Sequence, residues 1–340
     1  MGSSNLLLRV GDPESARVVA LLDPKNEVVG AGCLVSSDTV LTCLHVVKAA
    51  TGRAEVSKGS SLRMRICGLE RPIEVEGYVE KKSETKGLAG DLAMIRMALP
   101  RGQKLRVSET EFAAPFRHGG KTFSVVGFPE GNADGYYASG MMRGANVAGV
   151  VQLDGTGEIL VQGGFSGAPV WSSDLNAYVG LVVAELHPYR VAWCIPARVL
   201  CRFHPDLPVR FRIPYSDRPD VHDFGEDDPN VPLFGNVSDN GKRRLSVTRI
   251  KRANAKFRVD VKYECLQGSA RGRYVTFITH PSYSTRLEDA YELFSDVKDG
   301  VATNHFWADS SFTVAAVGDG GDTALTCDIG KSPHRPKDFK

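Results

Sequence analysis

The sequence lacks several features that would mark particular classes of protein. No apolar run approaches the ~20 residues of a transmembrane helix, and the brief run Leu6-Leu7-Leu8 is too short for a secretory signal. No CxxC pair is present, which argues against a zinc site. The 42 basic residues nearly balance the 40 acidic ones. We therefore expect no membrane association, metal or cofactor, and we do not expect nucleic acid as a partner.

The cysteines indicate a reducing environment. Their number, seven, is odd, and most are scattered among apolar or β-branched neighbours, as buried free thiols are. Disulfides persist mainly in oxidising compartments. We predict a cytoplasmic protein.

Short apolar runs dominate the first 200 residues. Many are rich in Val and Ile, and Gly, Asn, Asp, Ser and Pro separate them, a spacing typical of all-β barrels and sandwiches. The runs cover residues 17–22, 28–35, 39–43, 62–67, 73–79, 92–97, 122–128, 147–153, 177–186 and 190–195. A helix is expected over 197–203.

The character of the chain changes after residue 203. Six prolines and an acidic run punctuate residues 204–241, which predicts an extended connector. Strand-like runs then resume, enough for an immunoglobulin-like β-sandwich. They cover residues 244–250, 257–264, 274–279, 291–297, 312–317 and 323–329. We therefore divide the chain into a domain at 1–203, a linker at 204–241, a sandwich at 242–330 and a loose basic tail at 331–340.

Three local patterns could together carry nucleophilic catalysis. His45 ends a strand-like run, Asp91 stands at the entry to another, and Ser166 lies in a glycine-dense turn. A serine needs a base to take its proton, and an imidazole can do so near neutral pH once an acid holds its other nitrogen. The backbone N–H groups of Gly164 and Ser166 can form an oxyanion hole.

Each of these residues also has a plainer interpretation. A lone histidine at a strand end is more often structural, and Asp91 alone could merely cap a strand. Asp38 and Glu80 are alternative partners for His45, although neither precedes a Leu-Ala-apolar run as Asp91 does.

Residues 16–200 resemble the trypsin-like (chymotrypsin-fold) serine peptidases. The order His, Asp, Ser is that family's order, and the Val-Gly-Phe-Pro motif at 126–129 and the Trp-Cys-Ile-Pro motif at 193–196 match further. The resemblance implies two six-stranded β-barrels. It also implies a primary substrate pocket with a floor at Leu160 and walls from Val183, Ala184, Glu185 and Ala192.

One departure from the family concerns activation. In digestive and clotting relatives an acid before the serine pairs with a newly cut N-terminus, whereas this chain has Phe165. A phenyl ring cannot accept an ammonium group. We expect control by a partner, an oligomer or the attached domain instead.

The C-terminal region resembles the prokaryotic YEATS domains found beside effector enzymes of bacterial conflict systems. His280, Ser282 and Tyr283 match that family's first ligand loop, and Trp307 stands near the second. The second loop lacks the Gly-Trp-Gly pattern, which argues against acyl-lysine binding. A sandwich in which these aromatics only pack is the plainer alternative.

The sequence thus predicts a serine endopeptidase acting on peptides or proteins. We expect an antiviral defence or signalling effector, controlled by a protein partner through the C-terminal domain. A catalytically silent adaptor with a peptidase fold is the main alternative. A quality-control protease of the HtrA type ranks last, because no GLGF-like loop of a PDZ domain is present.

Overall fold

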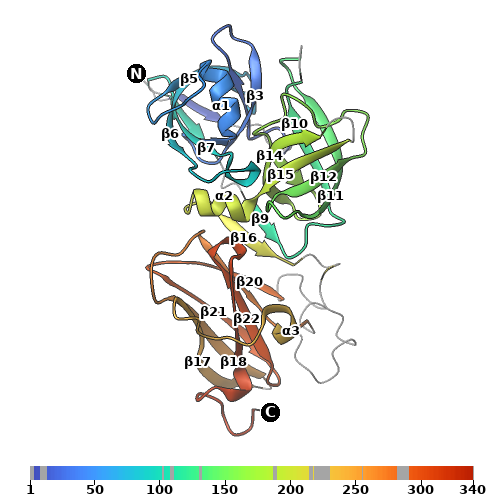
Figure 1. Ribbon diagram of the computed structural model, residues 1–340. Helices are drawn as coiled ribbons and strands as arrows, with labels where there is room; N and C mark the ends of the chain where they lie inside the picture. The colour runs from blue at the N-terminus through green and yellow to red at the C-terminus, as the bar shows by residue number, and fades with distance from the viewer. Residues whose placement is uncertain are drawn as a thin grey trace. The chain divides into compact units, whose positions relative to one another are not determined.

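The computed structural model describes residues 4–7, 14–101, 103–107, 111–129, 132–186, 190–213, 217, 230–254, 256–281 and 291–339. Two compact units make up the chain (Figure 1). The first comprises Met1–Phe112 and Arg117–Phe203, and the second comprises Ala113–Phe116 and His204–Lys340.

The first unit begins with a closed six-stranded barrel in the order β2-β3-β4-β7-β6-β5. Its elements are β2 (Val18–Leu22), β3 (Val28–Leu34), β4 (Thr39–Thr42), α1 (Leu44–Thr51), β5 (Ser61–Ile66), β6 (Ile73–Lys82), the 3-10 turn η1 (Leu88–Gly90) and β7 (Ala93–Ala98). Strand β6 buries alternate residues, as a strand with one face in a barrel core does. Helix α1 packs on β3 and β5.

A second six-stranded barrel follows in the same unit, in the order β13-β10-β11-β12-β15-β14, and the pairing of β13 with β14 closes it. Its elements are β10 (Thr122–Gly127), β11 (Tyr136–Ala145), β12 (Val151–Gly155), β13 (Pro169–Ser172), β14 (Ala177–Leu186), β15 (Val191–Pro196) and α2 (Ala197–Phe203). Strands β1 (Ser4–Leu7) and β8 (Gln103–Arg106) pair in parallel, and β9 (Phe112–Pro115) precedes the barrel.

The second unit is a β-sandwich of a three-stranded sheet, β17-β18-β21, and a four-stranded sheet, β20-β19-β22-β23. Its strands are β17 (Arg243–Ala253), β18 (Lys256–Cys265), β19 (Tyr274–Ile278), β20 (Glu292–Asp296), β21 (Val301–Ala308), β22 (Thr313–Gly318) and β23 (Thr323–Asp328). Val259 of β18 and Val314 of β22 both belong to the shared core. The predicted all-β class, two barrels and C-terminal sandwich are confirmed.

The segment expected to be an extended connector contains structure of its own. Strand β16 (Val209–Arg212) and helix α3 (Asn230–Phe234) lie within it, and the 3-10 turns η5 (Asp319–Gly321) and η6 (Ile329–Lys331) follow later. Phe211 and Phe234 pack edge to face with ring centroids 6.2 Å apart.

The C-terminal segment differs from the loose tail that its charges suggested. Phe339 is fully buried in the sandwich core, with its ring 4.8 Å from that of Phe257. One aromatic side chain buries enough apolar surface to hold a short charged segment in place.

Among the described residues, no helix combines the length and apolar character that crossing a bilayer would demand.

A buried ion pair anchors one end of the sandwich. Arg243 and Asp319 have side chains only 8% and 6% exposed, and two guanidinium nitrogens donate to the carboxylate at 3.0 Å. Asp319 also accepts from the Arg271 N–H and the Thr323 hydroxyl. Burial alone would raise the pKa of Asp319, but these hydrogen bonds outweigh it and the pKa lies below its ordinary value.

We expect Asp319→Ala to destabilise the second unit by about 3–5 kcal/mol, because it leaves Arg243 buried without its counter-charge. Hydrogen exchange of strands β17 to β23 in the full chain measures this. Arg244→Ala is the control, since the Arg244–Asp239 pair is exposed and should contribute about 1 kcal/mol or less. Equal losses from the two variants would contradict the expectation.

The same pair gives a pH dependence. A carboxyl whose pKa is lower in the folded state stabilises it above the unfolded pKa of about 3.9 and loses that stabilisation as pH falls through the folded value. Protection of β17 to β23 should therefore decline below about pH 4 in the wild type, and less steeply in Asp319→Ala.

Candidate active site

His45 lies in the first turn of helix α1, directly after strand β4. The sequence predicted a histidine at the end of a strand, whereas the chain turns into a helix after Cys43. The first N–H groups of a helix have no acceptor within it, and here two of Asp91's oxygens serve as acceptors. The His45 N–H donates to Asp91 Oδ1 at 3.0 Å and the Leu44 N–H to the Asp91 backbone oxygen at 3.4 Å. Asp91 thus caps the helix end that carries His45.

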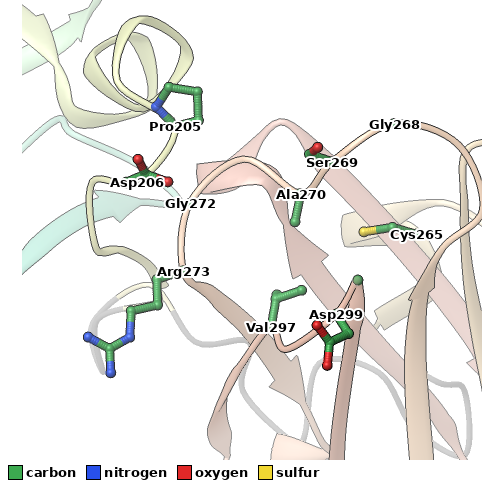
Figure 2. A pocket seen from close by; sticks show the side chains of 11 residues that line it. Pro205, Asp206, Cys265, Gly268, Ser269, Ala270, Gly272, Arg273, Val297 and Asp299 are labelled. Carbon is green, nitrogen blue, oxygen red and sulfur yellow. The ribbon is translucent and has the colours of Figure 1, made fainter.

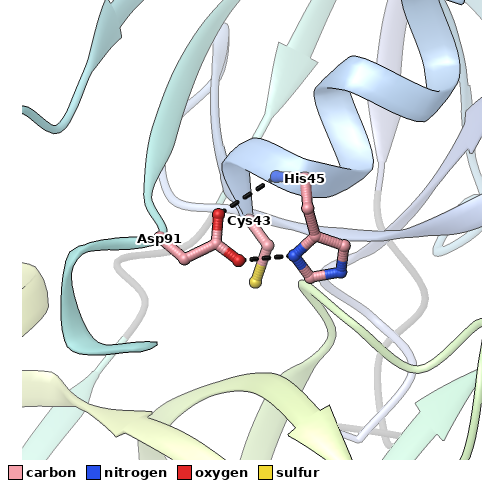
Figure 3. Close-up of side chains that lie close together, drawn as sticks. All are labelled: Cys43, His45 and Asp91. Atoms are coloured by element: carbon pink, nitrogen blue, oxygen red, sulfur yellow. Dashed lines mark hydrogen bonds and ion pairs between the residues drawn. The ribbon is translucent and has the colours of Figure 1, made fainter. Parts of the chain in front are cut away.

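The Asp91 carboxylate also binds the imidazole, because His45 Nδ1 hydrogen-bonds to Asp91 Oδ2 (Figure 3). With Nδ1 donating, Nε2 keeps its lone pair free to accept a proton. Burial by itself would raise the pKa of Asp91. Hydrogen bonds from the His45 ring and from the His45 and Leu44 backbone outweigh burial, so the pKa lies below its ordinary value. Asp91 is therefore ionised at neutral pH, and His45, 48% exposed, is open to a substrate.

The two alternative partners of His45 are engaged elsewhere. Arg96 binds Asp38 at 2.7 Å and Glu80 at 2.8 Å. Both carboxylates therefore serve one arginine on β7, and the acid beside His45 is Asp91.

Cys43 lies next to this pair. Its sulfur, a His45 nitrogen and an Asp91 oxygen lie within 4.8 Å of one another, a grouping close enough for a metal ion (Figure 3). A metal would require the thiolate. Burial and the neighbouring Asp91 instead raise the pKa of the Cys43 thiol, and its Sγ–H donates to the Val182 carbonyl at 3.2 Å. The chemistry of this donor set favours a histidine–carboxylate pair over a metal centre.

Ser166 lies in a turn that we call the serine turn, residues 164–168. Gly164 and Gly167 have φ values of +93° and +84°, a region that favours glycine. A Cβ at Gly164 would lie 1.9 Å from the Phe128 carbonyl oxygen, so no other residue fits. Phe165 between them is fully buried. Ser166 itself stays partly exposed.

The serine turn packs against the barrel that carries His45. The Ser166 carbonyl accepts from the Ala31 N–H on β3 at 2.8 Å. A Cβ at Gly30 would touch both the Val46 side chain, at 2.6 Å, and the Ser166 carbonyl oxygen, at 3.2 Å. Val46 directly follows His45. The fold therefore brings the backbone of Ser166 beside the first turn of α1, from about 120 residues away in the chain.

Two backbone donors in the serine turn are unused. Neither the Gly164 N–H nor the Ser166 N–H donates to another residue within the described part of the chain, whereas the Phe165, Gly167 and Ala168 N–H groups do. Two free N–H groups beside a hydroxyl are suited to binding a negatively charged oxygen.

Comparison with protein families gives one match. Residues 30–181 match the family described as Trypsin-like peptidase domain. The match shows a likeness to trypsin-like peptidase domains over this segment of the chain. No curated protein is similar enough to the chain to count as a relative.

Solved structures similar to the chain include three with low sequence identity. A Glu endopeptidase is 15% identical, with a TM-score of 0.39, and the match covers 55% of this chain and 88% of that one. Neuropsin, a serine protease of mouse brain, is 13% identical, with a TM-score of 0.41 and coverages of 58% and 96%. Human heparin binding protein is 10% identical, with a TM-score of 0.43 and coverages of 57% and 92%.

The residues predicted to form the substrate pocket lie in one region of the second barrel. Ala192 on β15 pairs with Leu153 on β12 and with Glu185 on β14. Leu160 lies beside the end of β12, since its Cδ2 would be 3.0 Å from a Cβ at Gly155. Val183 and Ala192 are buried, while Leu160 and Ala184 are partly exposed. The side chain of Glu185 lies outside the described residues.

The predicted C-terminal site residues do not come together in the described part of the second unit. His280 packs on Phe312 with ring centroids 5.8 Å apart, and burial lowers its pKa. Trp307 is 43% exposed, whereas its neighbour Phe306 packs on Phe312 in the core. Alternation along β21 therefore turns Trp307 away from the core face that His280 approaches. Ser282 and Tyr283 lie outside the described residues.

A cavity of about 560 Å³ opens elsewhere on the second unit (Figure 2). Cys265, the loop 268–273 and Asp299 contribute to its lining, and none of the predicted site residues does. Arg273 at its edge is already paired with Asp296 at 2.8 Å.

The sequence did not predict helix α1 or the contact between Cys43 and the Val182 carbonyl near the site. The helix had a signal, since Gly52 after Lys48-Ala49-Ala50-Thr51 is typical of a helix end, and Gly52 adopts φ +64° there. Cys43 was interpreted only as a buried thiol, and the Val182 carbonyl that it binds has no side-chain signal at all.

Proposed function

We propose that the protein is a serine endopeptidase in which His45, Asp91 and Ser166 form the catalytic triad. The observation that carries the proposal is the Asp91 carboxylate bound to both the backbone and the ring of His45, beside the backbone of Ser166. This arrangement orients His45 with Nε2 free to act as a base.

In the proposed mechanism Ser166 Oγ attacks the carbonyl carbon of the substrate while His45 Nε2 takes the hydroxyl proton. Asp91 stabilises the imidazolium, and the unused N–H groups of Gly164 and Ser166 donate to the oxyanion. The tetrahedral intermediate collapses as His45 protonates the leaving amine. Water, activated by His45, then hydrolyses the acyl-enzyme and restores Ser166.

The proposed substrate is a peptide or protein strand that pairs with the backbone of β14. Leu160 at the pocket floor favours a small or apolar side chain before the scissile bond, because an apolar floor offers no partner to Arg or Lys. Backbone pairing supplies affinity in this binding mode, and the pocket supplies the selectivity.

We further propose that a partner controls the activity. Phe165, fully buried, would lie 2.3 Å from a Cβ at Gly127 and offers no carboxylate to a cut N-terminus. The C-terminal sandwich, which we propose to be YEATS-like, is the candidate for partner binding. The proposed setting is a cytoplasmic bacterial effector of defence or signalling. The seven free cysteines support the reducing compartment of this proposal. A catalytically silent adaptor is the alternative, and the two unused N–H donors count against it.

Labelling with a fluorophosphonate tests the proposed function. The wild type should label at Ser166, either alone or after addition of cell lysate, and Ser166→Ala should not label. Labelling only with lysate would support control by a partner. No labelling under either condition would favour the adaptor.

The oxyanion hole gives a sharper prediction. We expect Gly164→Ala to lower the labelling rate by about 10²–10³-fold, because the added Cβ pushes the Gly164 N–H out of place. Gly163→Ala is the matched control, since a Cβ there meets nothing within 4 Å, and it should label at the wild-type rate. If Gly164→Ala labels as fast as Gly163→Ala, Gly164 is no oxyanion donor.

A further inference from the structure

One backbone oxygen in the peptidase domain receives a donor from each side of the candidate active site. The Val182 carbonyl accepts from Cys43 Sγ at 3.2 Å and from the Gly167 N–H at 2.7 Å. Cys43 precedes His45 by two residues, and Gly167 directly follows Ser166. A carbonyl oxygen has two lone pairs, so both bonds can form together.

The strand that carries this carbonyl is itself tied to the serine turn. The Val182 N–H donates to the Ala168 carbonyl at 3.0 Å, so Val182 binds the turn through both backbone groups. On the other side, Cys43 is the residue at which the chain passes from β4 into α1. Its thiol therefore links the start of the His45 helix to the strand that supports Ser166.

Cys43 is suited to this contact in its burial and its protonation state. The residue is fully buried, and burial together with Asp91 raises the pKa of its thiol, so it keeps its proton and can donate. Among the described residues, the Sγ–H to Val182 bond is the one side-chain hydrogen bond from the β4–α1 junction to β14.

We propose that Cys43 is a positioning residue, which holds the His45–Asp91 pair in register with Ser166 through the Val182 carbonyl. This inference rests on the proposed peptidase function. Catalytic rates depend steeply on such register, and a displacement of about 1 Å can cost 10²-fold. A thiol is a weak donor, so we expect a smaller loss here, of about tenfold.

The test compares four forms of the full chain in fluorophosphonate labelling, with lysate if the wild type needs it. Cys43→Ala should lower the limiting labelling rate about tenfold at an unchanged half-saturating concentration. Cys43→Ser restores a donor and should label within about threefold of the wild type. Cys33→Ala is the matched control, because Cys33 is also fully buried in the same barrel. It should lose thermal stability as Cys43→Ala does, but label at the wild-type rate.

The outcomes separate the inference from the function on which it rests. A wild type that never labels overturns the proposed function, and the inference with it. A wild type that labels while Cys43→Ala labels equally fast overturns the inference alone. So does Cys43→Ser labelling as slowly as Cys43→Ala, or Cys33→Ala slowing labelling as much, since either result would reflect lost packing rather than a lost donor.

Discussion

Replacing Ser166 by alanine is expected to lower peptide-bond turnover by about 10⁶-fold, and His45→Ala should cost about as much. Without its hydroxyl the site has no nucleophile, and without its imidazole the hydroxyl keeps its proton. The double variant should be no slower than either single variant, because the two residues act as one unit. Peptide libraries digested by the full chain and analysed by mass spectrometry give the rates.

The control for these variants is Ser61→Ala, since Ser61 is an exposed serine at the start of β5 in the same unit. It should retain wild-type turnover. All variants should keep the thermal midpoint of the wild type within a few degrees, which would separate lost chemistry from lost folding. Turnover that persists in Ser166→Ala would mean that another group is the nucleophile.

Replacing Asp91 by asparagine should lower turnover by about 10⁴-fold while leaving the fold intact. An asparagine oxygen can still accept from the His45 N–H, so the end of α1 stays capped. Its amide can instead donate to His45 Nδ1, which moves the ring proton to Nε2 and removes the base that Ser166 needs. The loss of a negative charge also leaves the imidazolium unstabilised.

Asp38→Asn is the comparison for this prediction. Asp38 binds Arg96 at 2.7 Å, so its replacement should weaken a half-exposed ion pair and change turnover less than about threefold. If Asp38→Asn were as inactive as Asp91→Asn, the loss would reflect the barrel as a whole. If Asp91→Asn kept full activity, Asp91 would not orient His45.

Much of the architecture was predictable because barrels and sandwiches impose local patterns. Alternating burial in β6 follows from its period of two. Helix α2 begins at Ala197, as predicted, directly after the strand that ends at Pro196. The site was likewise visible as three separate motifs. The clearest is the serine turn, because the positive φ values at Gly164 and Gly167 favour glycine.

Other features depended on neighbours distant in sequence. Phe339 is buried because the sandwich core offers a place beside Phe257, and nothing in the charged segment around it indicates such a place. His280 and Trp307 were predicted to lie in two neighbouring ligand loops. Alternation along β21 instead turns Trp307 away from the core face that His280 approaches.

The candidate active site divides in the same way. The residue types available for catalysis can be read from the sequence alone. Ser166 can supply a nucleophile, His45 a base, and Gly164 the positive φ that the turn requires. The Leu-Ala-apolar run after Asp91 already favoured it as the acid beside His45. Only the fold, however, places Asp91 on the imidazole and both Asp38 and Glu80 on Arg96. It also decided the contact of Cys43 with the Val182 carbonyl, because every residue has a carbonyl and only the fold selects one as an acceptor.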